Sequence, residues 1–209
     1  MLFRSRTCQT IFAENERTVR RYLKALDRCI DINAFHWFAI DQVEAEQLQH
    51  FREAVLAGNN IAIISESGCP GIADPGQLLV AEAQQLNIPV VPLVGPNSLL
   101  LALMASGLNG QQFEFVGYLP VETAARNKRI KELELSSAKN NSTKLFIETP
   151  YRNNQMMKDL LSACKPETRI CVGKNITAPD ESIVTLTVKE WGKKIPELHK
   201  IPVIFLLQA

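Results

Sequence analysis

The chain has 209 residues, of which 46% are apolar and 22% are charged, the balance of an ordinary globular protein. A formal net charge of +1 excludes a strong overall field that would draw the protein onto nucleic acid, so any RNA contact needs a local basic patch. No stretch reaches the roughly 18 apolar residues that span a bilayer, and MLFRSRTCQT lacks the apolar core of a signal peptide. We therefore expect a soluble, cytoplasmic protein without a membrane partner.

The cysteines and histidines argue against a disulfide framework and against a metal site. The five cysteines are odd in number, widely spaced and form no CxxC motif, and the three histidines form no HExxH-type pattern. We expect reduced thiols and no bound metal.

The first part of the chain alternates between helical patterns and short apolar runs. A basic amphipathic helix is predicted over 15–27 and a second helix over 42–57, with Asp41 as its N-cap and Glu44 at the capping-box position. The apolar run Ile61–Ile64 is typical of a strand that is buried on both faces of a parallel sheet.

The same alternation continues after a long loop. Helices are predicted up to about residue 86 and over 98–106, and strands over 90–94, despite Pro92, and over 113–116. The order of strand, loop and helix predicts a doubly wound parallel sheet.

The segment Gly117–Pro120 resembles a joint between two domains. Helices are predicted beyond it over 122–135 and 151–164, and strands over 144–147, 169–172, 182–188 and 202–207. We therefore predict an α/β protein with two domains, 1–118 around the doubly wound parallel sheet and 119–209 around a mixed α/β sheet.

Four loops follow predicted strands, which is where open α/β sheets bind ligands. The loop 65–76, SESGCPGIADPG, holds three glycines and two prolines in twelve residues, and it is longer than the usual turn of two to six residues. Its backbone N–H groups could bind a carboxylate or the edge of a base. The others are 95–98, in which Ser98 would cap a helix, 146–152 and 173–177. The length of the 65–76 loop favours a functional role, whereas each of the other three, taken alone, is equally consistent with an ordinary turn.

None of these loops carries a motif of the common nucleotide-binding or hydrolase families. GxGxxG, GxxxxGK[ST] and GxSxG are all absent from the sequence. The sequence therefore lacks the motifs that usually indicate NAD binding, ATP binding or serine-hydrolase activity.

Taken together and in order, the motifs resemble one group. SESGCPGIADPG is similar to "SDAGTPGISDPG", and PLVGPNSLLLALMASGL to "PLPGPSAVIAALSASGL", of the ribosomal RNA small-subunit methyltransferase I group in the tetrapyrrole-methylase superfamily. FVGYLP, FIETPYR and IFAENERTVRRYLKAL resemble its "FxGFLP", "FYESPHR" and "IAAEDTRHTRKLL". The resemblance covers nearly the whole chain.

The resemblance implies a fold, a cofactor and a substrate. The group has a two-domain tetrapyrrole-methylase-like fold, binds S-adenosylmethionine in the cleft between its domains, forms homodimers and methylates a ribose 2′-hydroxyl of a cytidine in small-subunit ribosomal RNA. Cofactor contacts are implied at Gly68, Cys69, Pro70, Gly71, Ile72, Ala73, Gly95, Pro96, Ser98, Ile147, Glu148, Thr149, Asn175 and Ile176.

Methyl transfer from a sulfonium needs an aligned acceptor and the removal of a proton. Glu66 and Glu148 stand at strand ends and are the candidate catalytic carboxylates, while Arg152 and Lys174 could orient a phosphate. Two basic clusters could contact RNA or could simply lie on solvated helix faces: Arg17, Arg20 and Arg21, and Arg126, Lys128, Arg129 and Lys131.

The sequence departs from the group in three ways. The group opens with a strand and a "TPIGN"-like loop that have no counterpart before AENERT, so we expect an N-terminally truncated cofactor domain. Glu66 and Asn15 replace aspartates, and Tyr151 replaces a histidine. Two alternatives stay open: a methylase of a small molecule such as a tetrapyrrole, and a non-catalytic homologue that binds S-adenosylmethionine.

Overall fold

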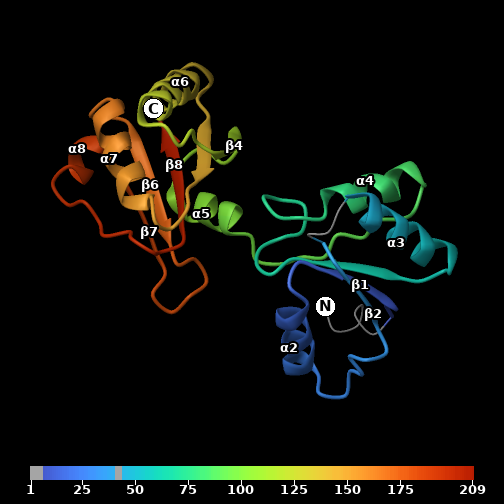
Figure 1. Ribbon diagram of the computed structural model, residues 1–209. Helices are drawn as coiled ribbons and strands as arrows, with labels where there is room; N and C mark the ends of the chain where they lie inside the picture. Colours follow the sequence, from blue (N-terminus) through green and yellow to red (C-terminus); the bar gives the residue numbers. More distant parts are fainter. Residues whose placement is uncertain (1–6, 41–43) are drawn as a thin grey trace. The chain divides into compact units, whose positions relative to one another are not determined.

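The computed structural model describes residues 7–40 and 44–209 of the chain (Figure 1). Its tertiary contacts divide the chain into two compact units, Met1–Pro96 and Asn97–Ala209, which we call unit 1 and unit 2. The division lies earlier in the chain than the predicted boundary near residue 118. The reason is that the strand Phe113–Tyr118 pairs within the sheet of unit 2.

Unit 1 is built around a three-stranded parallel sheet with the order β2-β1-β3. Its strands are β1 (Thr10–Ala13), β2 (His36–Ala39) and β3 (Ile61–Ile64). In the central strand, Thr10 is in register with His36 on one side and with Ile61 on the other. The sequence patterns did not predict β1 or β2, because TIFA and HWFA each begin with a polar residue and lack the continuous aliphatic run of Ile61–Ile64.

The central strand sends its side chains alternately to two hydrophobic clusters. Ile11 and Ala13 pack with Val19 and Leu23 of α2, whereas Phe12 packs with residues of α3 and α4. These helices are α2 (Glu16–Leu26), α3 (Glu44–Leu56) and α4 (Gln77–Gln85). Helices therefore cover both faces of the sheet, and the predicted doubly wound arrangement is confirmed.

Local signals fix some helix ends, and one predicted strand is absent. Asn15 caps α2 by accepting a hydrogen bond from the Thr18 N–H at 3.1 Å. The predicted cap Asp41 lies outside the described residues.

The strand predicted over residues 90–94 is not formed in the structure. Pro92 has no N–H to donate to a ladder, and Val94 is fully exposed.

Unit 2 contains a five-stranded mixed sheet with the order β4-β5-β8-β6-β7. Its strands are β4 (Phe113–Tyr118), β5 (Thr143–Ile147), β6 (Arg169–Lys174), β7 (Ser182–Thr187) and β8 (Val203–Gln208). β4 and β5 are parallel, and the remaining neighbours are antiparallel. The predicted mixed sheet is confirmed, with each of its strands close to the predicted range.

Helices lie on both faces of this sheet as well (Figure 1). On one face α5 packs over Leu145, Cys171 and Leu206, and on the other Phe146 and Phe205 stack at 5.7 Å beneath the remaining helices. The helices are α5 (Ser98–Ser106), α6 (Thr123–Asn140), α7 (Asn153–Ala163) and the short α8 (Val188–Trp191). Within the described residues, no helix combines the length and the apolar character that crossing a membrane requires.

Candidate functional site

The strand order of unit 1 creates a topological switch point where β1 and β3 end. The chain leaves β1 toward β2 on one side and returns to β3 on the other, and ligands of open α/β sheets bind at such points. Glu14 follows β1, and its N–H donates to the Ile64 carbonyl at 3.0 Å. The Glu66 N–H in turn donates to the Glu14 Oε2 at 2.7 Å. The first residues of the 65–76 loop are thus fixed against the end of β1.

Glu66, a predicted catalytic carboxylate, lies at this switch point. Its Oε1 accepts a hydrogen bond from the Thr18 hydroxyl at 2.8 Å, which links the loop to the first turn of α2. The residue is exposed, so its carboxylate remains accessible to a ligand.

The 65–76 loop has a backbone shape that requires glycine at two positions. Gly68 has φ +76°, and a Cβ placed on it would lie 3.0 Å from the Asp74 Oδ2. Gly76 has φ +118°, and its Cβ would lie 3.0 Å from the Ile63 Cγ2. Side chains at these positions would be both strained and crowded.

The loop also presents backbone donors that have no partner in the protein. The Gly71 N–H donates to the Pro75 carbonyl, which closes the loop on itself. By contrast, the N–H groups of Gly68, Cys69 and Ala73 donate to no atom in the part of the chain that the structure describes. Exposed N–H groups on a rigid turn suit a carboxylate or the acceptor edge of a base.

Asp74 is a residue of this loop that the sequence analysis did not select. Burial, followed by the negative charge of Glu14, raises the pKa of the Asp74 carboxyl above its ordinary value. Carboxyl groups whose pKa is raised in this way are common at functional sites. Its place within the Gly/Pro-rich loop SESGCPGIADPG was the available sequence signal, because the proximity of Glu14 depends on the fold.

The second predicted loop reaches the first within unit 1. The Cys69 thiol lies 3.9 Å from the Pro96 carbonyl oxygen, so Gly95 and Pro96 lie beside the 65–76 loop. The predicted cap at Ser98 is wrong. Asn97 caps α5 instead, because its Oδ1 accepts from the N–H groups of Leu99 and Leu100 at 3.0 and 3.2 Å.

The remaining predicted cofactor residues gather at one edge of the unit 2 sheet. Both β5 and β6 run antiparallel to β8, so their carboxyl ends, Ile147 and Lys174, lie at the same edge. The Asn175 N–H donates to the Pro202 carbonyl at 3.1 Å, and Ile147 and Ile176 pack against the same apolar cluster. The segments that follow β5 and β6 are therefore neighbours.

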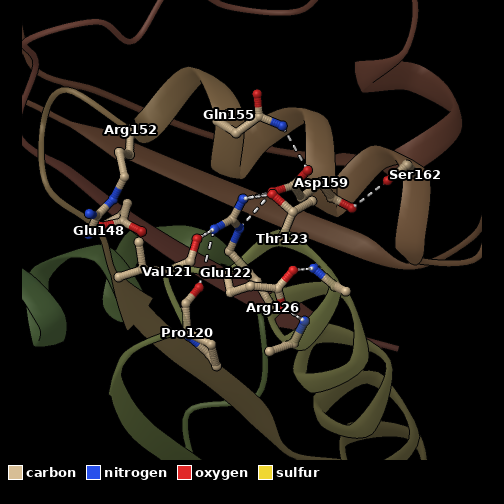
Figure 2. A network of polar contacts seen from close by, with 12 residues as sticks. Pro120, Val121, Glu122, Thr123, Arg126, Glu148, Arg152, Gln155, Asp159 and Ser162 are labelled. Carbon is tan, nitrogen blue, oxygen red and sulfur yellow. Dashed lines mark hydrogen bonds and ion pairs between the residues drawn. The ribbon is translucent and has the colours of Figure 1, made fainter.

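Glu148, the other predicted catalytic carboxylate, is engaged within unit 2. Its side chain is 1% exposed and lies 2.6 Å from the Arg152 Nη2 (Figure 2). The Glu148 Oε1 also accepts from the Thr149 N–H at 2.6 Å. The hydrogen bond to Glu148 raises the pKa of Arg152 above its ordinary value. This arrangement favours a role in positioning the loop.

Some residues of the two predicted basic clusters are used in internal contacts. Arg126 is buried, and its guanidinium binds Asp159 and the carbonyls of Pro120 and Val121 (Figure 2). The expectation that Arg126 could contact RNA is therefore wrong. In unit 1, Arg20 is paired with Glu16 and covers the Trp37 ring at 4.6 Å.

No three histidine, cysteine, aspartate or glutamate residues gather as a metal site would require within residues 7–40 and 44–209.

The family of the chain follows from comparison with known proteins. The model of the family described as Tetrapyrrole (Corrin/Porphyrin) Methylases matches residues 6–192. The chain belongs to the tetrapyrrole methylase family. The motif resemblance that the sequence analysis reported is confirmed by this match and by the relatives below.

The chain is similar to two curated relatives that share one name. It is 34% identical over 150 residues to the ribosomal RNA small subunit methyltransferase I of Vibrio cholerae, covering 72% of this chain and 51% of that protein. It is 31% identical over 177 residues to the protein of the same name from Haemophilus influenzae, covering 83% and 61% respectively. The chain thus spans about half to three-fifths of the length of these relatives.

Solved structures share the fold of this tetrapyrrole methylase. The methyltransferase CobJ matches with a TM-score of 0.62 and 16% identity, covering 99% of this chain and 85% of that chain. The uroporphyrin-III C-methyl transferase from Thermus thermophilus complexed with S-adenyl homocysteine matches with a TM-score of 0.56 and 15% identity, covering 100% and 89%. At these identities the likeness establishes the fold.

Proposed function

We propose that this tetrapyrrole methylase transfers a methyl group from S-adenosylmethionine to a ribose 2′-hydroxyl of small-subunit ribosomal RNA. The observation that carries the proposal is the 65–76 loop, a rigid turn with free N–H groups at the switch point of unit 1. The names of the curated relatives support RNA as the substrate class.

The residues of the loop fit the proposed cofactor. S-adenosylmethionine carries a carboxylate and an adenine edge, and both accept hydrogen bonds. The free N–H groups of Gly68, Cys69 and Ala73 are donors of the required kind.

When bound, S-adenosylmethionine supplies an electrophilic methyl group on its sulfonium. The protein then has to orient the acceptor hydroxyl and accept its proton. We propose Glu66 and Asp74 as the carboxylates for this proton, because both lie in the loop at the switch point. We assign Glu148 a positioning role, because Arg152 and the Thr149 N–H already occupy its carboxylate.

Further contacts and assembly belong to the same proposal. We propose that the edge of unit 2 formed by Ile147, Glu148, Thr149, Asn175 and Ile176 adds cofactor contacts, together with Gly95, Pro96 and Ser98. We also propose a cytoplasmic homodimer, as the resemblance implies. Size-exclusion chromatography with light scattering tests the dimer, and a monomeric mass at micromolar concentration would refute it.

Calorimetric titration with S-adenosylmethionine tests the cofactor site. We predict that Gly68→Ala weakens binding at least tenfold, because the new Cβ crowds Asp74 and disfavours the φ of +76°. Gly110→Ala is the matched control, since its Cβ would meet nothing within 4 Å. Equal affinities of the two variants, with unchanged melting temperatures, would exclude the loop as the cofactor site.

A methyl-transfer assay distinguishes the RNA substrate from a tetrapyrrole substrate. Small ribosomal subunits that lack the ribose methylation, incubated with labelled S-adenosylmethionine, should take up label in RNA. Uroporphyrin III is the parallel substrate, because solved relatives of the same fold act on it by name. Label in the porphyrin and none in RNA would overturn the RNA proposal in favour of a small-molecule methylase.

A further inference from the structure

Exposed aromatic and basic side chains gather at the edge of unit 2 where β5 ends and β8 begins. Because β5 and β8 pair antiparallel, with Ile147 opposite Ile204, the segments after β5 and before β8 emerge side by side. Tyr151 comes from the first segment and is 69% exposed. His199 and Lys200 come from the second and are also exposed.

Tyr151 lies beside each of the other two side chains. The rings of Tyr151 and His199 lie 6.0 Å apart with an interplanar angle of 70°, an edge-to-face arrangement. The Lys200 Nζ lies 6.0 Å from the centre of the Tyr151 ring. A tyrosine ring of this exposure, with a cation beside it, offers both a stacking surface and a positive charge.

Hydrogen bonds and a buried leucine fix the loop that carries His199 and Lys200. Leu198 is fully buried, and its N–H donates to the Asn154 Oδ1 at 2.8 Å. Glu197 accepts from the Asn154 amide at 2.6 Å and from the His199 N–H at 2.8 Å. The loop is therefore anchored to the first turn of α7.

Lys200 itself has a backbone conformation that favours glycine. Its φ is +61°, and its N–H donates to the Pro150 carbonyl at 2.9 Å. The Asn153 amide fixes the next residue by donating to the Ile201 carbonyl at 2.7 Å. These bonds fix the backbone at Lys200 before any partner binds, which lowers the entropy lost on binding.

The surroundings of these side chains add charge and a second aromatic ring. Arg152 is next to Tyr151 in the chain and its side chain is 39% exposed, although its Nε is buried without a partner among the described residues. Tyr118, at the end of β4, is 62% exposed and lies near enough to Arg152 to help raise the pKa of the guanidinium. Of the acidic groups nearby, Glu148 is covered, while Glu197 is exposed but tied by its hydrogen bonds.

We propose that Tyr151, His199 and Lys200 form a platform on which an unpaired nucleotide of the RNA substrate stacks, with Lys200 and Arg152 contacting phosphates. Proteins bind single strands by combining aromatic stacking with backbone cations, whereas a duplex hides the faces of its bases. The inference rests on the proposed action on RNA, and it adds the part of the surface that holds the substrate strand.

Fluorescence anisotropy with a labelled single-stranded RNA of about ten nucleotides tests the platform. Because one aromatic ring would be lost from the stack, Tyr151→Ala should weaken binding about tenfold, while Tyr151→Phe should bind like the wild type. Lys200→Ala should weaken binding and reduce the slope of log Kd against log salt by about one. Lys193→Ala, an exposed lysine of the same connecting segment, is the matched control and should bind like the wild type.

Two further measurements separate the platform from the proposed function. The same RNA annealed to its complement should bind wild type and Tyr151→Ala equally, and S-adenosylmethionine affinity should be the same in both. If Tyr151→Ala binds single-stranded RNA as well as the wild type, while methyl transfer to ribosomal subunits proceeds, the platform is refuted and the function stands. If the wild type neither binds RNA nor methylates it, both are refuted. Unchanged melting temperatures would show that the variants are folded.

Discussion

The buried ion pair between Arg126 and Asp159 should make unit 2 sensitive to the loss of either partner alone. The two side chains are 4% and 6% exposed, and the Arg126 Nε donates to the Asp159 Oδ2 at 2.6 Å (Figure 2). The same guanidinium donates to the carbonyl of Val121 at 2.6 Å and to that of Pro120 at 3.2 Å. One side chain thus ties α7 to the turn between β4 and α6.

Removal of the cation alone should be costly. Arg126→Met leaves the Asp159 carboxylate buried with only the Gln155 amide, at 2.9 Å, as a side-chain donor. Breaking one side of a buried pair typically lowers the free energy of unfolding by about 3–5 kcal/mol. At roughly 4–8 °C per kcal/mol for a domain of about 100 residues, the melting temperature should fall by more than about 10 °C.

Replacement of both partners should cost much less. In Arg126→Met/Asp159→Leu no unpaired charge is left, and buried pairs replaced by apolar side chains are often near neutral in stability. Arg129→Met is the matched control, because its pair with Glu132 at 3.3 Å is 42% and 48% exposed and should contribute less than about 1 kcal/mol.

Urea unfolding measured by tryptophan fluorescence is a suitable assay. The chain has two tryptophans, and Trp37→Phe leaves the buried Trp191 as the reporter for unit 2 alone. A loss of under about 1 kcal/mol for Arg126→Met, or a double variant as unstable as the sum of the single ones, would refute the reasoning.

Two further predictions concern titratable groups. The folded-state pKa of Asp74 is raised by burial and by Glu14, so this residue favours the folded state at low pH and loses that contribution as the pH rises above about 4. As the pH rises above about 4, the urea midpoint of the wild type should therefore fall relative to that of Asp74→Asn. Parallel plots of urea midpoint against pH for the two proteins would contradict the assignment. Burial raises the pKa of the Cys164 thiol to about 12 and also raises that of Cys171, whereas Cys29 is exposed. An aromatic disulfide reagent at pH 8 should label Cys29 in the native protein and reach Cys164 and Cys171 only in urea, with mass spectrometry identifying the sites; rapid native labelling of either buried thiol would contradict their burial.

The sequence alone determined the fold class, most elements and the family. The apolar runs of β3, β5, β6 and β8 are long enough to show burial, and the Gly/Pro-rich turns mark where those strands end. The sequence was a less reliable guide to a helix N-cap where two adjacent residues were both suitable. Asn97 caps α5 although Ser98 was predicted, because both types are good caps and only the backbone decides which one precedes the helix.

Tertiary structure alone decided which residues meet. Arg126 looked like part of a basic surface, yet its partner Asp159 lies 33 residues away and buries it. Burial and then the charge of Glu14 raise the pKa of Asp74. Glu14 lies near Asp74 because β1 and β3 are neighbours in the sheet, and no local pattern predicts that pairing. Burial and charge pairing depend on distances across the fold, whereas secondary structure depends mainly on near neighbours in the chain, so the sequence predicted the loops of the site but not their contacts.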